Sequence, residues 1–157
     1  MRLCVESLEK KGMKEAGLFK AEGKGANVAE LRAKLAGMAP NYADQALEGF
    51  EHDDVAAFLK LLFKEQEPPV LPNYTRFVAG LSDAKALKTA MAAEQHRAVL
   101  ERLCAFLATM CDHTDKNAMD ADALAKIWAP LLFHSRQKET IQIVKAFITE
   151  FDTVFED

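Results

Sequence analysis

Residues 53–72, DDVAAFLKLLFKEQEPPVLP, decide the fold class of this chain. Apolar side chains recur in this stretch at positions i, i+3, i+4 and i+7, a spacing that places them on one face of a helix. The apolar stripe consists of Val55, Phe58, Leu59 and Leu62. Pro68 and Pro69 then end the pattern, because proline lacks the backbone N–H that a helix interior needs. We therefore expect a helix over residues 53–66, followed by a break.

Helical spacing extends over most of the chain, whereas the period-two alternation typical of β-strands is almost absent. The expected helices span residues 2–11, 27–36, 53–66, 73–81, 83–90, 94–111, 120–132 and 144–155. No internal repeat and no low-complexity segment interrupts them. These patterns predict one all-α domain over residues 1–157, with about seven to nine helices.

Local signals refine the expected helix ends. Asn27 is a candidate N-cap of its helix, with Glu30 at the capping-box position three residues later. Pro130 lies inside an otherwise helical pattern, so we expect a kink or local unravelling near Ala129. The first helix begins at Met1 with little room for a cap, so we expect a module excised from a longer multidomain protein.

The composition is that of an ordinary globular domain. Half of the 157 residues are apolar and 28% are charged. The net charge of −4 gives no general reason to expect nucleic-acid binding, which needs a basic surface. The sequence has no signal peptide and no apolar run near the roughly eighteen residues of a membrane span. Its three cysteines form no disulfide framework, so we expect a cytoplasmic protein. A monomer is expected because the apolar stripes are all explicable as core.

The sequence contains no pattern typical of a self-contained catalytic or metal site. Cys104 and Cys111 lie seven residues apart and His113 follows them, but a zinc site needs about four converging ligands. The glycines of residues 23–25 resemble part of a phosphate loop, yet the G-x-x-x-x-G-K-[ST] pattern is absent. We therefore expect no metal, no cofactor and no nucleotide bound by this chain alone.

Two lysines, Lys60 and Lys64, lie four residues apart on the helix expected over residues 53–66 and project beside its apolar stripe. Like charges at this spacing repel each other by roughly 0.2–0.5 kcal/mol. One interpretation is a solvated helix face whose charge is softened by Glu65 and Glu67. The other is a cationic face that serves an anionic or acidic partner. Periodicity leaves both interpretations open.

Four segments resemble, in order and spacing, the motifs of the RhoGAP domain family. They are residues 17–23 (GLFKAEG), 27–35 (NVAELRAKL), 53–72 and 117–132 (NAMDADALAKIWAPLL). Family members typically have G-I-F-R-x-x-G, an E-L-R helix, L-K-x-F-[LF]-R-E-L-P-E-P-L and N-K-M-x-x-x-N-L-A-x-x-F-x-P-N-L. The resemblance covers nearly the whole chain. It implies an all-helical module that docks onto the switch regions of a GTP-loaded Rho-family small GTPase, with the GTP and magnesium held by that partner.

The resemblance also implies a catalytic position, and this chain departs from the family there. Typical members insert an arginine into the nucleotide site of the partner, and that arginine finger falls on Lys20. An arginine finger accelerates GTP hydrolysis by roughly 10³–10⁵. Lysine keeps the charge but loses the planar fork that makes bidentate contacts. The family asparagine just before L-A falls on Ala123, whose side chain neither donates nor accepts, and the asparagine of the P-N-L block is Leu131.

Other family positions are kept. The supporting lysine corresponds to Lys60, the arginine one turn later to Lys64, and the first asparagine of the N-K-M block to Asn117. The resemblance implies that these three side chains serve partner binding. It also implies a chain that is not itself an enzyme and acts in trans on a Rho-family GTPase. With Lys20 and Ala123 at the catalytic positions, we expect activation to be weak or absent.

Two alternatives stay open. A working activator would use Lys20, or an arginine contributed by the partner, as the catalytic cation. A non-catalytic helical adaptor would instead bind a lipid head group or another protein. Convergence of Lys20, Lys60 and Lys64 on one exposed face would favour the GTPase hypothesis, and neutralisation by acidic neighbours would favour the adaptor. Recruitment to membranes, through the GTPase or through flanking domains, is left open.

Overall fold

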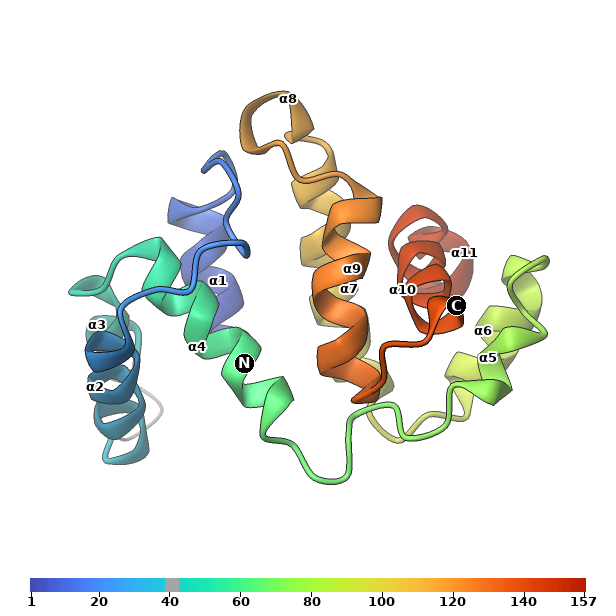
Figure 1. Cartoon of the computed structure of the whole chain (residues 1–157), viewed down its shortest axis with the longest axis horizontal. Helices are drawn as coiled ribbons and strands as arrows, with labels where there is room; N and C mark the ends of the chain where they lie inside the picture. Colours follow the sequence, from blue (N-terminus) through green and yellow to red (C-terminus); the bar gives the residue numbers. More distant parts are fainter. Residues whose placement is uncertain (39–42) are drawn as a thin grey trace.

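The computed structural model describes residues 1–38 and 43–157, and helices joined by loops make up the fold (Figure 1). The helices of these ranges are α1 (Arg2–Lys11), α2 (Gly25–Ala36), α3 (Ala43–Glu48), α4 (His52–Lys64), α5 (Thr75–Val78), α6 (Ala84–Ala92), α7 (Arg97–Cys111), α8 (Thr114–Asn117), α9 (Ala121–Phe133), α10 (Lys138–Thr149) and α11 (Phe151–Phe155). The predicted all-α class is confirmed. None of the described helices is long and apolar enough to cross a membrane.

The helices outnumber the expected seven to nine because several are only one or two turns long. α3, α5, α8 and α11 each contain between four and six residues, which is too short for a periodic pattern to show. α1 begins and ends at the predicted residues. The helix expected over residues 144–155 is in fact the end of α10 followed by α11, and the two separate at Glu150.

α9 lies at the centre of the fold. It packs against α10 on one side and α4 on the other, and it also contacts α7, which lies behind it in Figure 1. α2 and α3 form an outer layer next to α4 and α1. α5 and α6 lie at the opposite edge, against α10 and α11. Of the helices that carry the family motifs, α4 therefore packs directly against α9, and α2 packs against α4.

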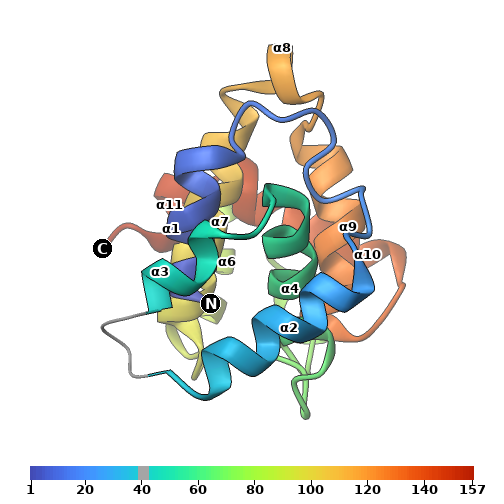
Figure 2. The same ribbon diagram turned by 90° about the vertical axis from the view of Figure 1, so that its left-hand side faces the viewer.

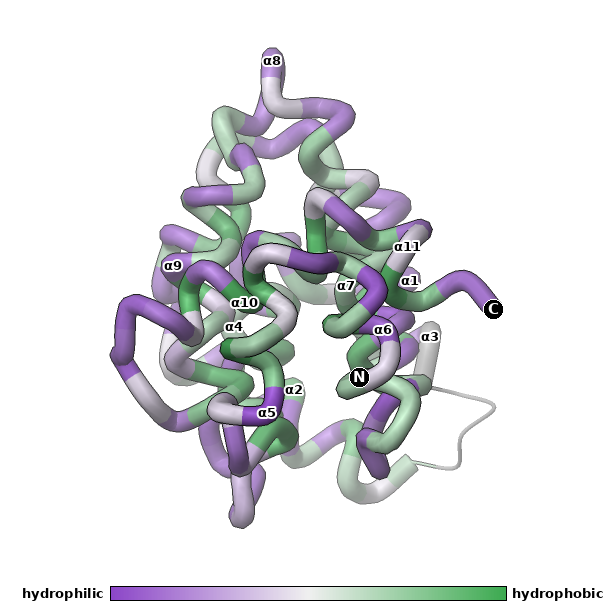
Figure 3. Tube along the Cα trace, turned by 90° about the vertical axis from the view of Figure 1, so that its right-hand side faces the viewer, coloured by the Kyte–Doolittle hydropathy of each residue, from purple (hydrophilic) through white to green (hydrophobic). Residues whose placement is uncertain are grey.

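Aromatic rings fill the space between these helices. Trp128 of α9 is fully buried and makes edge-to-face contacts with Phe19 and Phe63, at centroid distances of 5.1 and 5.4 Å. Such pairs add about 0.5–1.5 kcal/mol beyond the burial of their area. Figure 3 shows the contrast with the periphery, where the tip of α8 and the C-terminal end are hydrophilic. Through Phe19, the segment before α2 thus packs against Trp128 of α9, which also contacts Phe63 of α4.

α9 continues through Pro130 to Phe133, so the expected unravelling near Ala129 is wrong. A proline inside a helix costs roughly 3 kcal/mol. Ala129, Leu132 and Phe133 are nevertheless buried in the core, and their burial requires the helix to continue. The carbonyl of Leu132 also accepts a hydrogen bond from the backbone N–H of Leu71, at 2.9 Å.

The expected cap of α2 is also wrong. The helix begins at Gly25, and Lys24 occupies the N-cap position without a side-chain hydrogen bond. Asn27 lies inside the first turn and forms no capping box with Glu30. Its amide instead donates to the carboxylate of Asp54 on α4, at 2.9 Å. Asn27 is therefore bonded to a residue of another helix, and not to the backbone or to Glu30 of its own first turn.

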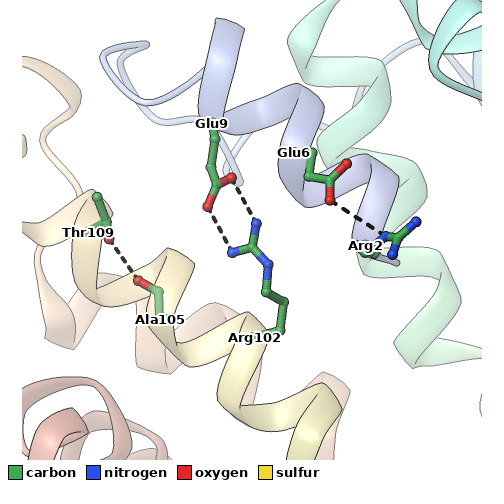
Figure 4. Close-up of polar contacts among 6 residues, drawn as sticks. All are labelled: Arg2, Glu6, Glu9, Arg102, Ala105 and Thr109. Carbon is green, nitrogen blue, oxygen red and sulfur yellow. Dashed lines mark hydrogen bonds and ion pairs between the residues drawn. The ribbon is translucent and has the colours of Figure 1, made fainter.

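An ion pair joins α1 to α7. Arg102 donates two parallel hydrogen bonds to Glu9, each 2.8 Å long (Figure 4). The bonding to Glu9 raises the pKa of the Arg102 guanidinium. Parallel bonds of this kind fix geometry as well as adding energy. α1, which leads into the segment that carries Lys20, is thereby attached to the central helices.

Candidate functional site

Residues 12–24, between α1 and α2, form a loop that is named the finger loop below. Figure 2 shows it as a blue trace that arches from the end of α1 towards α9 and descends to α2. Lys20 is exposed in this loop, in a turn where its backbone N–H donates to the carbonyl of Gly17 at 2.8 Å. Gly17 has φ of +64°, in the left-handed region that favours glycine. This backbone places the Lys20 side chain at the surface.

Leu18 and Phe19 anchor the finger loop in the core immediately before Lys20. Their side chains are at most 1% exposed. The ring of Phe19 lies edge-on to Trp128 and to Phe106, the latter at 6.0 Å. Because two consecutive side chains are packed in this way, the backbone at Lys20 has little freedom. A side chain carried on a pre-ordered backbone loses less entropy when it meets a ligand.

Lys60 of α4 lies directly against the finger loop. Its ammonium group donates a hydrogen bond to the carbonyl of Phe19 at 2.8 Å. Burial lowers the pKa of Lys60, and the charge of Glu22 partly opposes this shift. An ammonium group has three donors, so the bond to Phe19 leaves capacity for a partner. The structure therefore places the Lys60 ammonium group beside the backbone that carries Lys20.

Lys64 lies one turn further along α4 and is exposed. The acidic residues that could soften its charge contact other groups. Glu65 pairs with Arg32 of α2 at 2.8 Å, and Glu67 lies 3.4 Å from His134. This arrangement favours the cationic-face interpretation of α4 over the neutralised one.

Asn117 is fully buried in α8 and has no exposed surface for a partner. Its amide donates to the carbonyls of Met13 and Met110, both at 2.9 Å, and its side-chain oxygen accepts from the N–H of Met119 at 2.8 Å. Its backbone carbonyl accepts from the N–H of Gly17 at 2.9 Å. The structure thus places Asn117 where it holds the start of the finger loop, and not where it can touch a partner directly.

Ala123 lies in the first turn of α9 and is partly buried. Its backbone N–H donates to the N-cap carboxylate of Asp120 at 2.8 Å. Leu131, two turns further along α9, also packs against the core. Neither side chain can form a hydrogen bond, so both positions where the family has asparagine offer only apolar contact.

Asp54 is a residue of this region that the sequence did not reveal as important. Its side chain is 2% exposed and accepts a hydrogen bond from the backbone N–H of Lys24 at 2.7 Å. The only signal in the sequence was the place of Asp54 in the first turn of an expected helix. An acidic residue there is already explained by the helix dipole, which stabilises negative charge, so it does not suggest a tertiary role.

The chemistry that this site can provide is electrostatic. Lys20, Lys60 and Lys64 place cationic groups on the finger loop and the adjoining helix α4. In the described ranges, no group of three or more histidine, cysteine, aspartate or glutamate side chains is arranged to hold a metal ion. Fixed cations of this kind can stabilise charge on a phosphoryl group that another molecule holds. Fold and site together define an all-helical module with a cationic loop.

The chain matches the RhoGAP domain family over residues 1–137. Human Rho GTPase-activating protein 24 is 26% identical over 92% of this chain and 21% of its own length. The human breakpoint cluster region protein is 29% identical over 89% of this chain and 12% of its own length. The chain thus spans only about a fifth, or less, of these relatives.

Solved structures share the fold. Human Rho GTPase activating protein 15 has a TM-score of 0.87 at 21% identity, covering 98% of this chain and 82% of that one. The BH domain from Graf, the GTPase regulator associated with focal adhesion kinase, has a TM-score of 0.86 at 20% identity, covering 99% and 92%. This chain belongs to the RhoGAP domain family.

The expectation that the chain is not an enzyme is corrected by these relatives. Human Rho GTPase-activating proteins 24 and 4 are named for the activation of GTP hydrolysis, which is a catalytic action. The sequence has no phosphate loop of its own. A catalytic group can, however, act on a nucleotide that another protein holds, so a missing nucleotide motif does not exclude catalysis.

Proposed function

We propose that this chain binds a GTP-loaded Rho-family small GTPase and acts on its GTP through Lys20, with weak or absent acceleration of hydrolysis. The names of its relatives suggest the class of partner. The observation that carries the proposal is the position of Lys20, exposed directly after the buried Phe19, whose carbonyl Lys60 holds. The backbone that carries this cation is already held, so only the side chain has to become ordered when it meets the phosphates of a docked partner.

Two features limit the expected rate. The Lys20 ammonium is a compact point charge, and it cannot reproduce the two parallel hydrogen bonds that a guanidinium makes to phosphate oxygens. Ala123 offers no hydrogen-bonding side chain where the family has an asparagine. Docking can therefore persist in this chain without strong catalysis. Lys60 and Lys64 of α4 are kept for binding, whereas the catalytic positions hold Lys20 and Ala123.

The charge arrangement supports a GTPase partner over a lipid head group or a generic adaptor contact. Lys60 approaches the backbone beside Lys20, and the acids Glu65 and Glu67 contact other residues. A partner that presents both acidic side chains and nucleotide phosphates would match cations on the loop and on α4 at the same time.

The test is single-turnover GTP hydrolysis by a panel of Rho-family GTPases, with the unaltered chain, with Lys20→Arg, and with Lys20→Arg combined with Ala123→Asn. We expect little stimulation by the unaltered chain. Lys20→Arg should increase the stimulated rate by at least about tenfold, because it restores the planar fork. Addition of Ala123→Asn should raise the rate further.

Lys24→Arg is the matched control. Lys24 is an exposed lysine of the same loop, and its contact with Asp54 uses only the backbone N–H. With this variant, the GTPases should hydrolyse GTP at the rate measured with the unaltered chain. Strong stimulation without any substitution would contradict weak activation, and failure to bind every loaded GTPase of the panel would contradict the proposed partner.

A further inference from the structure

Asp54 is a buried acid to which the proposed function assigns no role. It lies in the first turn of α4. One carboxylate oxygen accepts the backbone N–H of Lys24 at 2.7 Å, and the other accepts the amide of Asn27 at 2.9 Å. A carboxylate taken out of water is tolerated only when hydrogen bonds replace its hydration. Asp54 therefore requires both donors, and it fixes the junction of the finger loop and α2.

The backbone of the finger loop packs closely against α4 at the same point. Gly23 has φ of +67°. A Cβ atom there would lie 3.0 Å from the Cβ of Ala57 and 3.1 Å from a carboxylate oxygen of Asp54. Both the backbone conformation and the space favour glycine. The end of the loop thus has little freedom to shift along α4.

Lys20 lies between two anchors that belong to one helix. On its N-terminal side, Lys60 holds the carbonyl of Phe19. On its C-terminal side, Asp54 holds the N–H of Lys24. Because Lys60 and Asp54 are both on α4, a single rigid element fixes the short segment that presents the Lys20 side chain.

We propose that Asp54 is a positioning residue for the action of Lys20 on the partner's GTP. This inference rests on the proposed function. Asp54 acts through the backbone of Lys24 and holds the loop in the arrangement that the docked complex needs, before docking occurs. The ordering cost is then met during folding. Loss of the anchor should slow hydrolysis while the GTPase still docks, because Lys60 and Lys64 remain on α4.

Three variants test this role, each in a Lys20→Arg background where stimulation is easier to measure. Asp54→Ala leaves the N–H of Lys24 and the amide of Asn27 without their acceptor. Asp54→Asn combined with Asn27→Asp exchanges the pair: the new amide donates to the new carboxylate, and its oxygen still accepts from Lys24. Asp53→Asn is the matched control, since the neighbouring Asp53 is less buried and takes part in neither bond.

Two readouts follow the loop without any GTPase: the rate of trypsin cleavage after positions 20 and 24, and hydrogen exchange of the Lys24 amide. Two more follow function, namely affinity for the loaded GTPase and the maximal rate of hydrolysis. Asp54→Ala should increase cleavage and exchange by about tenfold or more and lower the maximal rate by about tenfold. Affinity should change by less than about threefold. The exchanged pair should restore the loop and the rate, and Asp53→Asn should alter neither.

The possible outcomes separate a positioning role of Asp54 from a purely structural one. If Asp54→Ala loosens the loop but leaves the maximal rate unchanged, the positioning role is wrong, while stimulation by the parent leaves the proposed function standing. If affinity falls as much as the rate, or if the exchanged pair restores the loop without the rate, Asp54 is only structural. If the Lys20→Arg parent binds no loaded GTPase, the proposed partner is wrong. If it binds but stimulates no GTPase, the action through position 20 is wrong, and in both cases the role of Asp54 fails.

Discussion

Asp54 and Asn117 are two of the few polar side chains buried in the described part of the chain, and they hold opposite ends of the finger loop. Burial of such groups is costly unless their hydrogen bonds are made. The loop has no helix or strand of its own at Met13 and Lys24 to satisfy its backbone. Side chains of α4 and α8 supply those hydrogen bonds, so these two residues keep an exposed loop ordered.

The role of Asn117 can be tested by changing one atom type. Asn117→Asp is nearly isosteric, but it replaces the donor that faces the carbonyls of Met13 and Met110 with an acceptor. We expect the free energy of unfolding to fall by about 2–4 kcal/mol, because buried carbonyls would face a carboxylate oxygen. Urea denaturation measures this change.

The control for that experiment lies on the same short helix. Asp115 is exposed, and Asp115→Asn should alter the free energy of unfolding by no more than about 0.5 kcal/mol. If Asn117→Asp were as stable as this control, the hydrogen bonds of Asn117 would not be holding the loop and α8 together.

At the scale of elements, α5 and α6 meet at a point where no side chain fits. A Cβ atom at Gly80 would lie 2.7 Å from Cδ2 of Leu87 and 2.8 Å from its backbone nitrogen. The backbone atom cannot move aside as a flexible side chain would. Gly80→Ala should therefore lower the free energy of unfolding by about 2 kcal/mol or more, measured by urea or thermal unfolding.

Gly25, in the first turn of α2, is the matched control for Gly80. A Cβ atom added there meets no atom within 4 Å. Gly25→Ala should be neutral or should stabilise the fold by up to about 1 kcal/mol, because alanine restricts the unfolded chain and favours helix. Equal destabilisation by both substitutions would contradict close packing at Gly80.

The two long helices that carry most of the site were predicted closely. α4 and α9 begin within one residue of the expected positions, because their apolar stripes are long and regular. α8, which holds the finger loop, was missed. It has only four residues, and its position depends on hydrogen bonds made by Asn117.

At the scale of the whole molecule, the three cysteines report on packing. Burial raises the pKa of the Cys104 thiol to about 12, and it also raises the pKa of Cys4 and of the half-buried Cys111. Because a thiol reacts as its thiolate, these shifts slow every cysteine at neutral pH. We expect only Cys111 to react with an aromatic disulfide reagent in the folded state, at a rate that increases as the pH is raised.

Cys4 and Cys104 should react only when the chain unfolds, so denaturant should raise the count of reactive thiols to three. Cys111→Ser is the control and should abolish the reaction of the folded protein. Rapid modification of Cys104 without denaturant would mean that α7 is not packed in the core as described.

The sequence alone determined the all-α class, the positions of α4 and α9, the family and the identity of Lys20, Ala123, Lys60 and Lys64 at the motif positions. These features depend on periodicity and spacing within short windows, which an apolar stripe or a motif records directly. Only the tertiary structure decided which polar residues are buried and what they bind. The bonds that hold the finger loop join residues 30, 41 and 104 positions apart, from Asp54, Lys60 and Asn117 respectively. Such pairings leave no local pattern, because they exist only when α4, α8 and α9 have packed together.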